Sequence, residues 1–416
     1  MSLFRLPAWV IKAIDRIRRD FLWSGPDIDK PGVRLVSWKA LCRSREQGGW
    51  GILDLQNFNQ ALLGKWGWKL INNSNWGGAE IIHFNYGSSS GDLFPKRRGR
   101  MSYFWRGVLS VYPALRCCVS SVIHSGTDTL FWKDRWLKGR APMYVWNELY
   151  RSCRQQDASF MDLAHLLEEY PFCEDAELVQ IRDRWRNCGN GVRDRKCWAL
   201  NGNGVFSVKS LYNFLNDGGA RCEIANFFWK SKCPKKINIF AWLVWKNRIL
   251  TLENLELRRC NKLPTATCVM CHADVESVDH LFLQCPIARE VWGFFGRLLG
   301  FPAPPSAMNC VWREWRGSVG PNSRAVVDLV VKALLWNIWI ARNDRIFNDK
   351  FMSSYCILLC INRMLLSWFD ALADGAKARL DDTMATVRRS LEFLESKNQR
   401  DRGDSTAEEA PDRSIE

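Results

Sequence analysis

The chain has 416 residues, a net charge of +15, a hydrophobic content of 47% and 22 tryptophans. This length leaves room for two or three domains that each bury a core, and the apolar content excludes a largely disordered protein. No apolar run approaches the ~20 residues that a membrane-spanning helix needs, so the sequence gives no indication of a membrane partner.

The first seventy residues predict two helices separated by a loop. Apolar residues at helical spacing predict an amphipathic first helix, and they are Leu6, Val10, Ile14, Ile17 and Phe21. The tetrapeptide that starts at Trp23 contains Gly and Pro and ends this helix. A second helix is predicted over residues 54–70, where one apolar stripe contains Leu55, Phe58, Leu62, Trp66 and Leu70.

The middle of the chain mixes loops, short helices and strands. Residues 72–100 are rich in Asn, Gly and Ser and are typical of a surface linker. A short helix precedes a β-type segment at residues 124–137, and residues 141–185 have a helical pattern. The Gly-containing turn at 201–204 predicts a β-hairpin between residues 196–200 and 205–208, and Ser207 is a candidate cap for the helix that follows.

The remainder of the chain predicts further helices. One spans residues 234–250, with Pro234 near its first turn and with lysines and an arginine opposite its apolar stripe. Others cover residues 287–299, 325–347 and 355–372, and a polar helical stretch follows. The last residues are polar and predict a disordered tail.

Three cysteines and one histidine form a C-x2-C-x8-H-x4-C array. They are Cys268, Cys271, His280 and Cys285. Three thiolates and one imidazole are the ligand set of a closed, four-coordinate structural zinc site. The two-residue gap lets Cys268 and Cys271 bind from one tight turn, and the segment from 279 to 285 predicts a helical turn that presents the other two ligands. A lone C-x2-C would be weak in a chain with 16 cysteines, but all four ligands together are specific.

The same segment also contains the attachment pattern of a c-type haem. Residues 268–272 read C-V-M-C-H. Haem attachment needs export, whereas the N-terminus has no uninterrupted apolar segment with a small-residue cleavage site. The haem interpretation also leaves His280 and Cys285 without a role, so zinc is preferred.

Positive charge is concentrated in two parts of the sequence. Residues 1–110 contain 17 Lys and Arg against 8 Asp and Glu, and residues 221–262 contain 10 against 3. Basic stretches interleaved with Trp and Phe beside a zinc site suit a phosphate backbone with stacked bases. A solubilising basic surface explains the charge alone equally well.

Several segments together resemble the C-terminal half of plant LINE-type (non-LTR) retrotransposon polyproteins. The Cys/His array and its flanks, FWKSKCPKKINIFAWLVW before it and HLFLQCPIAREVW after it, look like the reverse-transcriptase zinc-binding domain. The segment GVFSVKSLYNFL is similar to the usual lead-in of that domain, and residues 1–70 resemble the region after the polymerase palm. The resemblance covers about residues 1–347 and implies that Cys268, Cys271, His280 and Cys285 are the zinc ligands.

The chain departs from that family in its catalytic residues. A reverse transcriptase needs metal-binding aspartates, including a D-D turn between two strands. The D-D pair of this chain, Asp381 and Asp382, lies in a polar helical stretch without flanking strands. Motifs of nucleotide hydrolases, serine hydrolases and zinc proteases are also absent. We therefore expect a non-enzyme that lacks the polymerase palm and has no catalytic residues.

These patterns predict a mainly α fold with short β-hairpins and six regions. They are a thumb-like helical region (1–72), a Gly/Ser/basic linker (73–102), a mixed helical and hairpin region (103–200), the zinc-binding domain (201–300), a C-terminal helical region (306–394) and a disordered tail (395–416).

The predicted function is non-specific binding of RNA or DNA by a retrotransposon-derived fragment with structural zinc. The residues expected to contact phosphates are Lys235, Lys236, Lys246, Arg248, Arg258 and Arg259. The alternative is a zinc-stapled helical module that binds other proteins, or a relic without function. Scattered cysteines without secretory features predict a reducing, intracellular location, and the nucleus is favoured over the cytoplasm.

Overall fold

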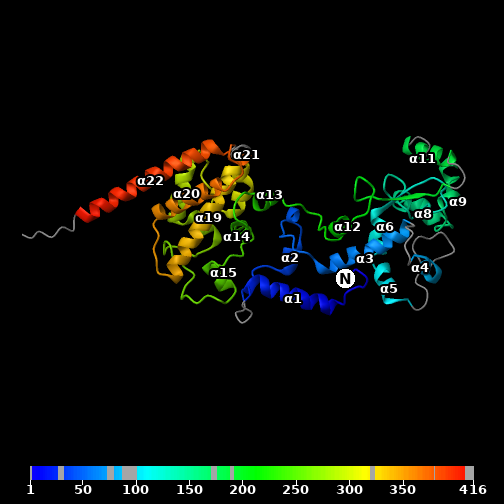
Figure 1. Ribbon diagram of the computed structural model, residues 1–416, viewed down its shortest axis with the longest axis horizontal. Coiled ribbons are helices and arrows are strands. Elements are labelled where there is room, and N and C mark those ends of the chain that lie inside the picture. Colours follow the sequence, from blue (N-terminus) through cyan, green and yellow to red (C-terminus); the bar gives the residue numbers. More distant parts are fainter. Residues whose placement is uncertain are drawn as a thin grey trace, which may run out of the picture. The chain divides into compact units, whose positions relative to one another are not determined.

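The computed structural model describes residues 2–26, 32–72, 79–86, 101–169, 176–187, 192–318, 324–378 and 380–407. Its regular structure is almost entirely helical, and the described residues contain one sheet of two antiparallel strands (Figure 1). The predicted mainly α fold class is therefore confirmed. The chain forms two compact units: unit 1 comprises residues 1–33, 38–44 and 50–219, and unit 2 comprises residues 34–37, 45–49 and 220–416.

The main core of unit 1 forms around α3. This helix packs against α5, α6 and α12, and Leu63, Leu115 and Leu211 are fully buried between them. The helices of unit 1 are α1 (Ala8–Ser24), α2 (Trp38–Cys42), α3 (Leu55–Ile71), α4 (Ala79–Tyr86), α5 (Tyr103–Leu109), α6 (Tyr112–Cys118), α7 (Pro142–Val145), α8 (Asn147–Ser152), α9 (Phe160–Leu163), α10 (Leu166–Glu169), α11 (Ala176–Arg186) and α12 (Val208–Leu215).

Two glycines allow the helices of this core to approach closely. A Cβ atom at Gly64 would lie 2.3 Å from Leu211, and one at Gly67 would lie 2.4 Å from Leu115. Any larger residue would push α12 or α6 away from α3. The predicted cap of α12 is confirmed, because the Ser207 hydroxyl accepts a hydrogen bond from the backbone N–H of Ser210 at 3.1 Å.

The sheet pairs two distant segments of unit 1. Strand β1 (Val119–Val122) lies antiparallel to β2 (Arg195–Trp198), with Val119 opposite Trp198. The predicted turn is present, since the Gly204 N–H bonds the Asn201 carbonyl, but residues 205–208 form no strand. The prediction of a local hairpin there was wrong. Strand β2 has alternating buried residues and pairs with β1, whose residues alternate in burial in the same way.

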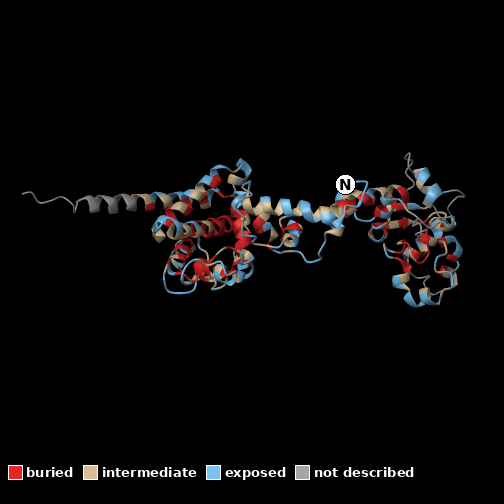
Figure 2. Ribbon diagram, turned by 90° about the horizontal axis from the view of Figure 1, so that it is seen from below, coloured by how far each residue is buried: buried red, intermediate tan, exposed pale blue. Residues whose placement is uncertain are grey.

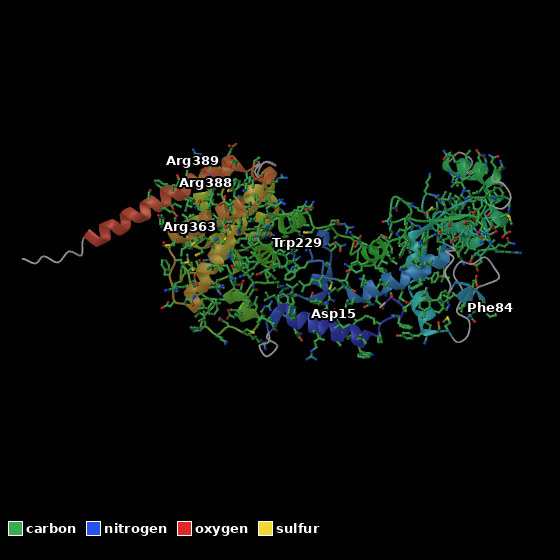
Figure 3. All side chains as sticks on the ribbon, viewed as in Figure 1. Asp15, Phe84, Trp229, Arg363, Arg388 and Arg389 are labelled. Atoms are coloured by element: carbon green, nitrogen blue, oxygen red, sulfur yellow. The ribbon has the colours of Figure 1, made fainter. Side chains whose placement is uncertain are left out.

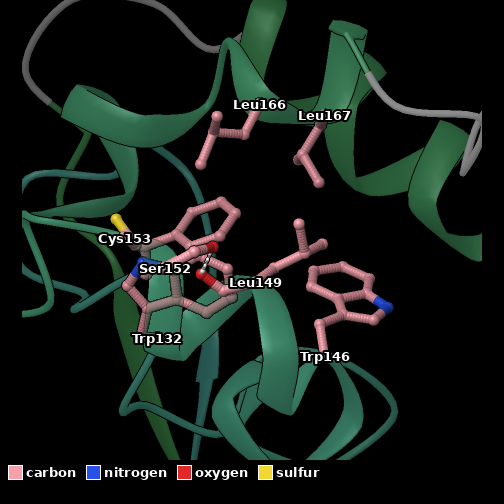
Figure 4. Close-up of a pocket in the computed structure, with 8 residues that line it drawn as sticks. Trp132, Trp146, Leu149, Ser152, Cys153, Leu166 and Leu167 are labelled. Atoms are coloured by element: carbon pink, nitrogen blue, oxygen red, sulfur yellow. Dashed lines mark hydrogen bonds between the residues drawn. The ribbon is translucent and has the colours of Figure 1, made fainter.

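A second apolar cluster of unit 1 surrounds Phe131, Trp132 and Phe160. The predicted β-type segment at residues 124–137 lies here as turns with isolated bridges and forms no strand. A cavity of about 210 Å³ opens beside this cluster, between Trp132 and Trp146 on one side and Leu166 and Leu167 on the other (Figure 4).

Helix α1 has an exposed apolar face. Trp9, Ile17 and Phe21 are 72%, 70% and 68% exposed, and no residue of this helix is buried. The helix is held by Arg18, which stacks on Trp38 and donates to the Leu53 carbonyl at 2.9 Å. The amphipathic pattern in the sequence is therefore real, but its apolar stripe does not face the core.

Unit 2 is a helical bundle built around α19 (Arg324–Phe347). This helix contacts α14, α16 and α20, and Leu334, Leu335 and Ala341 in it are fully buried. Figure 2 shows the buried residues of the chain in red. The other elements of unit 2 are the 3-10 turn η1 (Arg45–Gln47), α13 (Ala225–Trp229), α14 (Lys235–Trp245), α15 (Leu252–Leu257), the π-helical turns η3 (His280–Gln284) and η4 (Val311–Trp315), α16 (Pro286–Leu299), α17 (Met308–Cys310), α18 (Arg316–Ser318), α20 (Ser354–Asp370), α21 (Asp374–Lys377) and α22 (Asp381–Ala407).

The compact units group the chain more coarsely than the six predicted regions. Residues of the expected zinc-binding domain after position 219 and the expected C-terminal helical region share unit 2. Helix α22 extends through residues 395–407, which the sequence predicted as part of a disordered tail. Most of the expected linker at 73–102, and residues 408–416, lie outside the described residues.

None of the helices within the described residues is both long enough and apolar enough to cross a bilayer.

Candidate metal centre

The first two cysteines of the array lie on a tight hairpin of unit 2. The Cys268 N–H donates to the Asp274 carbonyl at 2.7 Å, and the His272 N–H donates to the Cys268 carbonyl at 2.8 Å. A bridge between Thr267 and Val275 closes the hairpin. His272 has a positive φ of 55°, so the chain turns sharply just after Cys271. This turn brings the two thiols to one side.

His280 and Cys285 lie at the two ends of a π-helical turn. The Cys285 N–H donates to the His280 carbonyl at 2.7 Å, which is an i to i+5 bond. On a regular α-helix residues five apart point about 140° away from each other. The wider π-turn brings them to the same side, so the predicted helical turn is present in a form that the sequence did not specify. Pro286 then starts α16 directly after Cys285.

The four side chains converge on one point. Their ligand atoms all lie within 4.8 Å of one another, and the Cys271 Sγ lies 3.2 Å from the His280 Nε2. Tetrahedral zinc, with Zn–S of ~2.3 Å and Zn–N of ~2.0–2.1 Å, separates its ligand atoms by about 3.4–3.8 Å. The donor set and its spacing therefore fit zinc. His272, which the haem interpretation needs, is exposed and lies outside the cluster.

The protonation of the cluster suits a cation. Burial lowers the pKa of His280 and favours the neutral imidazole that binds metal. The hydrogen bond between Cys268 and Cys285 raises the pKa of Cys268 and lowers that of Cys285. Burial opposes the shift at Cys285, whereas the backbone N–H groups at the start of α16 support it. Zinc would take the place of the proton that the two thiols share.

A buried ion pair connects the hairpin to the rest of unit 2. The Arg342 guanidinium on α19 contacts the Glu276 carboxylate at 2.7 Å and the Leu250 carbonyl at 3.2 Å. The same carboxylate accepts the Leu252 N–H at 3.0 Å, at the start of α15. Both charged side chains are buried. The sequence analysis missed this pair, because the partners are 66 residues apart and neither belongs to a motif.

The six predicted phosphate-binding residues lie around α14 and α15. Lys235 and Lys236 begin α14, whereas Lys246 and Arg248 follow its end, and all four are exposed. Arg259 is also exposed, just after α15.

Arg258 and the nearby tryptophans are less available to a ligand. The Arg258 guanidinium donates to the Arg34 and Leu35 carbonyls at 3.3 and 3.2 Å. Trp242 is fully buried and donates to the Gly48 carbonyl. Trp229, labelled in Figure 3, is half-buried, and the Arg45 guanidinium lies over its ring; Trp245 packs on Phe228.

Two further lysines extend this basic region. Lys230 and Lys232 are exposed in the loop between α13 and α14. The sequence contains a signal for these two lysines, because residues 224–252 contain six Lys and Arg and no Asp or Glu. Their side chains were not singled out from the sequence because they stand outside the helical periodicity.

The aspartate pair Asp381 and Asp382 begins α22, and both residues are exposed. In the part of the chain that the structure describes, the zinc cluster is the one group of three or more side chains arranged to hold a metal.

Comparisons with known proteins agree with the zinc site. A family model described as zinc-binding in reverse transcriptase matches residues 206–292. A protein of Arabidopsis thaliana named "Putative ribonuclease H protein" is 27% identical over 329 residues, which cover 72% of this chain and 51% of that relative. An uncharacterized mitochondrial protein of the same plant is 31% identical over 144 residues, 34% of this chain and 93% of that relative. The chain thus spans about half the length of the first relative.

Proposed function

Because this chain belongs to the family of the uncharacterized mitochondrial protein of Arabidopsis and matches the zinc-binding domain of reverse transcriptases, we propose that it is retrotransposon-derived and that its unit 2 binds RNA or DNA. Zinc holds the hairpin and the start of α16 together, and it takes no part in chemistry because protein atoms supply all four ligands. We further propose that the chain derives from a LINE-type (non-LTR) retrotransposon.

The observation that carries this proposal is the charge around α14. Its apolar face is buried, and six cations without an acidic residue lie in the surrounding residues 224–252. Lys235 and Lys246 are separated by about 16 Å along the helix axis. That distance corresponds to roughly five base steps at the duplex rise of about 3.4 Å per strand, and to fewer in a more extended single strand. The two ends of α14 can therefore contact separate phosphates of one strand.

The binding is expected to be insensitive to base sequence. Lysine ammonium groups are point charges that match phosphates but do not read base edges. Four phosphates neutralised on a single strand by the cations around α14 should contribute about −3 to the slope of log affinity against log salt. We expect no polymerase, nuclease or ribonuclease H activity, and a nuclear location would give the protein access to both nucleic acids.

The test compares two variants of the full, zinc-loaded chain. The first replaces four exposed cations around α14 (K235A/K236A/K246A/R248A). The matched control removes four exposed arginines elsewhere in unit 2 (R297A/R313A/R388A/R389A), of which Arg388 and Arg389 lie on α22 (Figure 3). Fluorescence anisotropy with labelled single-stranded RNA and DNA is measured from 50 to 300 mM salt.

The α14 variant should bind at least about tenfold more weakly at low salt and should flatten the salt slope by about three. The control should retain most of the slope. If both variants bind alike, the charge around α14 is a solubilising surface, and a zinc-stapled module for protein partners becomes the better interpretation.

A further inference from the structure

A second basic groove lies in unit 1, far from the zinc cluster in sequence. It has a volume of about 490 Å³ and is formed by residues 5–12, by the first turns of α3 and by α5. Arg5, Lys12 and Arg106 line it, together with the amide side chains of Gln56 and Gln60. No Asp or Glu is among the residues that form its walls.

The backbone of this groove is held in place by specific contacts. Asn59, which is buried, accepts the Leu6 N–H at 2.8 Å and donates to the Phe4 carbonyl at 2.9 Å. The Tyr103 hydroxyl donates to the Arg5 carbonyl at 2.8 Å. These bonds hold the extended segment before α1 against α3 and α5, so the Arg5 side chain is positioned at the groove and does not move freely with the N-terminus.

The three cations of the groove are exposed, and among the described residues none of them forms an ion pair. The Arg106 guanidinium lies over the Tyr103 ring, 5.5 Å from its centre, so a base would stack on the other face of that ring. Three unneutralised charges around one polar groove repel each other, so an anion bound there would relieve that repulsion.

Aromatic rings stand beside these cations. Tyr103, 47% exposed, lines the groove, and Phe4, 52% exposed, lies with its ring centre 6.0 Å from that of Tyr103. Trp9, one turn before Lys12 on α1, is 72% exposed. Cations that follow a backbone, next to exposed rings on which bases stack, are the pattern of a single-strand nucleic-acid site.

We infer that this groove binds the backbone of a single-stranded RNA or DNA, with phosphates at Arg5, Lys12 and Arg106 and a base stacked on Tyr103. The amides of Gln56 and Gln60 supply uncharged hydrogen bonds to the sugar–phosphate chain. The site is distinct from the basic surface of unit 2 and does not depend on zinc.

The test uses the full, zinc-loaded chain and a labelled eight-nucleotide oligouridylate in anisotropy titrations at several salt concentrations. The groove variant is R5A/K12A/R106A. Its matched control, R151A/R154A/R193A, removes three exposed arginines of unit 1 that lie outside the groove. The groove variant should bind about tenfold more weakly or worse at low salt and should flatten the salt slope by about two, since each phosphate on a single strand contributes about 0.7. The control should bind like the parent.

Two further variants test the stacked base. Tyr103→Leu should lose at least about fivefold in affinity, whereas Tyr103→Phe, which keeps the ring but loses the hydrogen bond to the Arg5 carbonyl, should lose clearly less. The conservative R5K/R106K variant should keep most of the salt slope, because lysine preserves the charge. Circular dichroism and thermal melting confirm that each variant is folded.

Clear results would overturn the inference. One is an unchanged salt slope in the groove variant, and another is an equal loss of affinity in the groove variant and in the control. A third is displacement of the oligonucleotide by polyglutamate as effectively as by polyuridylate, which would assign an acidic peptide to the groove. The unit 2 variant separates the two proposals. If only the unit 2 variant loses affinity, the groove is not a binding site and the proposed function stands. If only the groove variant loses affinity, the groove is the binding site and the proposed function of unit 2 fails.

Discussion

At the scale of single residues, we expect the Cys/His cluster to stabilise the hairpin of unit 2. Replacing Cys285 with Ser removes one of its four thiol or imidazole groups, at the residue that joins η3 to α16. We expect the zinc content of the purified protein to fall from about one equivalent to well below it. Structural zinc contributes folding free energy on the order of 10 kcal/mol in small domains, so residues 266–292 should exchange their amide hydrogens faster.

Elemental analysis and hydrogen exchange measure both effects. Cys260→Ser is the control, because Cys260 is an exposed thiol outside the cluster and its loss should leave the zinc content unchanged. Full zinc content in the Cys285→Ser protein would show that the four side chains are only packed together.

The buried lysine of α19 predicts a pH-dependent stability. Lys332 is fully buried and donates to the Phe227 carbonyl and, at 2.5 Å, to the Asn238 Oδ1. Burial lowers its pKa from 10.5 to about 8. Below pH 8 it is charged in both folded and unfolded chains, and the folded state bears the cost of burying the charge. Between pH 8 and 10.5 only the unfolded chain stays protonated, so this cost disappears as the pH rises.

Comparison with Lys332→Met isolates this effect, because methionine does not titrate. The free energy of unfolding of the parent should rise relative to that of the variant by about 3 kcal/mol between pH 8 and 10.5. Urea unfolding followed by tryptophan fluorescence at several pH values measures it. Lys350→Met, at an exposed lysine, should show no such trend, and parallel curves for Lys332→Met and the parent would contradict the prediction.

The ligand set could be predicted from the sequence because its chemistry is local. Cys268, Cys271, His280 and Cys285 lie within eighteen consecutive positions, their side chains converge in the structure, and their residue types suit zinc. Glu276 and Arg342 could not be predicted, because their pairing depends on how α19 packs against the hairpin. The sequence could not predict that Arg258 and Trp242 are engaged within the protein, since each contacts the backbone of a segment roughly 200 residues earlier.

At the scale of elements, the Glu276–Arg342 pair ties the hairpin to α15 and α19. Arg342→Met leaves a buried carboxylate without its countercharge, which typically costs about 3–5 kcal/mol. The double variant E276Q/R342M removes both charges and should recover a substantial part of that loss. Urea unfolding of the two single variants and the double variant measures the coupling. Additive losses would show that the two side chains do not stabilise each other.

Helix positions followed from the sequence more reliably than helix environments. The apolar spacing of α3, α16 and α19 is encoded locally, so the predicted ranges 54–70, 287–299 and 325–347 agree closely with the structure, and Ser207 caps α12 as predicted. The amphipathic pattern of α1 was read correctly as well, yet its apolar face is exposed. Periodicity specifies that a helix has an apolar face, but the partner of that face depends on the rest of the fold.

The sheet shows the same limit for strands. Residues 195–198 have a strand pattern, and the nearest turn suggested residues 205–208 as the partner. The structure pairs them with residues 119–122, so that Lys196 meets Asp134 at 3.0 Å and Ser121 at 2.8 Å inside unit 1. A buried charge needs such partners, and this requirement outweighs proximity in the sequence.

At the scale of the whole molecule, the chain presents two basic surfaces in two separate units. The zinc cluster and the cations around α14 belong to unit 2, whereas Arg5, Lys12 and Arg106 belong to unit 1. Two contacts on one nucleic-acid chain would raise the overall affinity without any new interaction, because the second contact becomes intramolecular. Weak individual sites are therefore compatible with stable binding by the full protein.

The most direct test of the central claim is a lysine footprint of the full, zinc-loaded chain. Lysines are acetylated briefly with and without saturating single-stranded RNA, and the modified positions are quantified by mass spectrometry. We predict that Lys235, Lys236 and Lys246 are protected by RNA, while the exposed Lys209 and Lys350 react equally in both samples. Saturated RNA binding with no protection at these three lysines would contradict the assignment of nucleic-acid binding to unit 2.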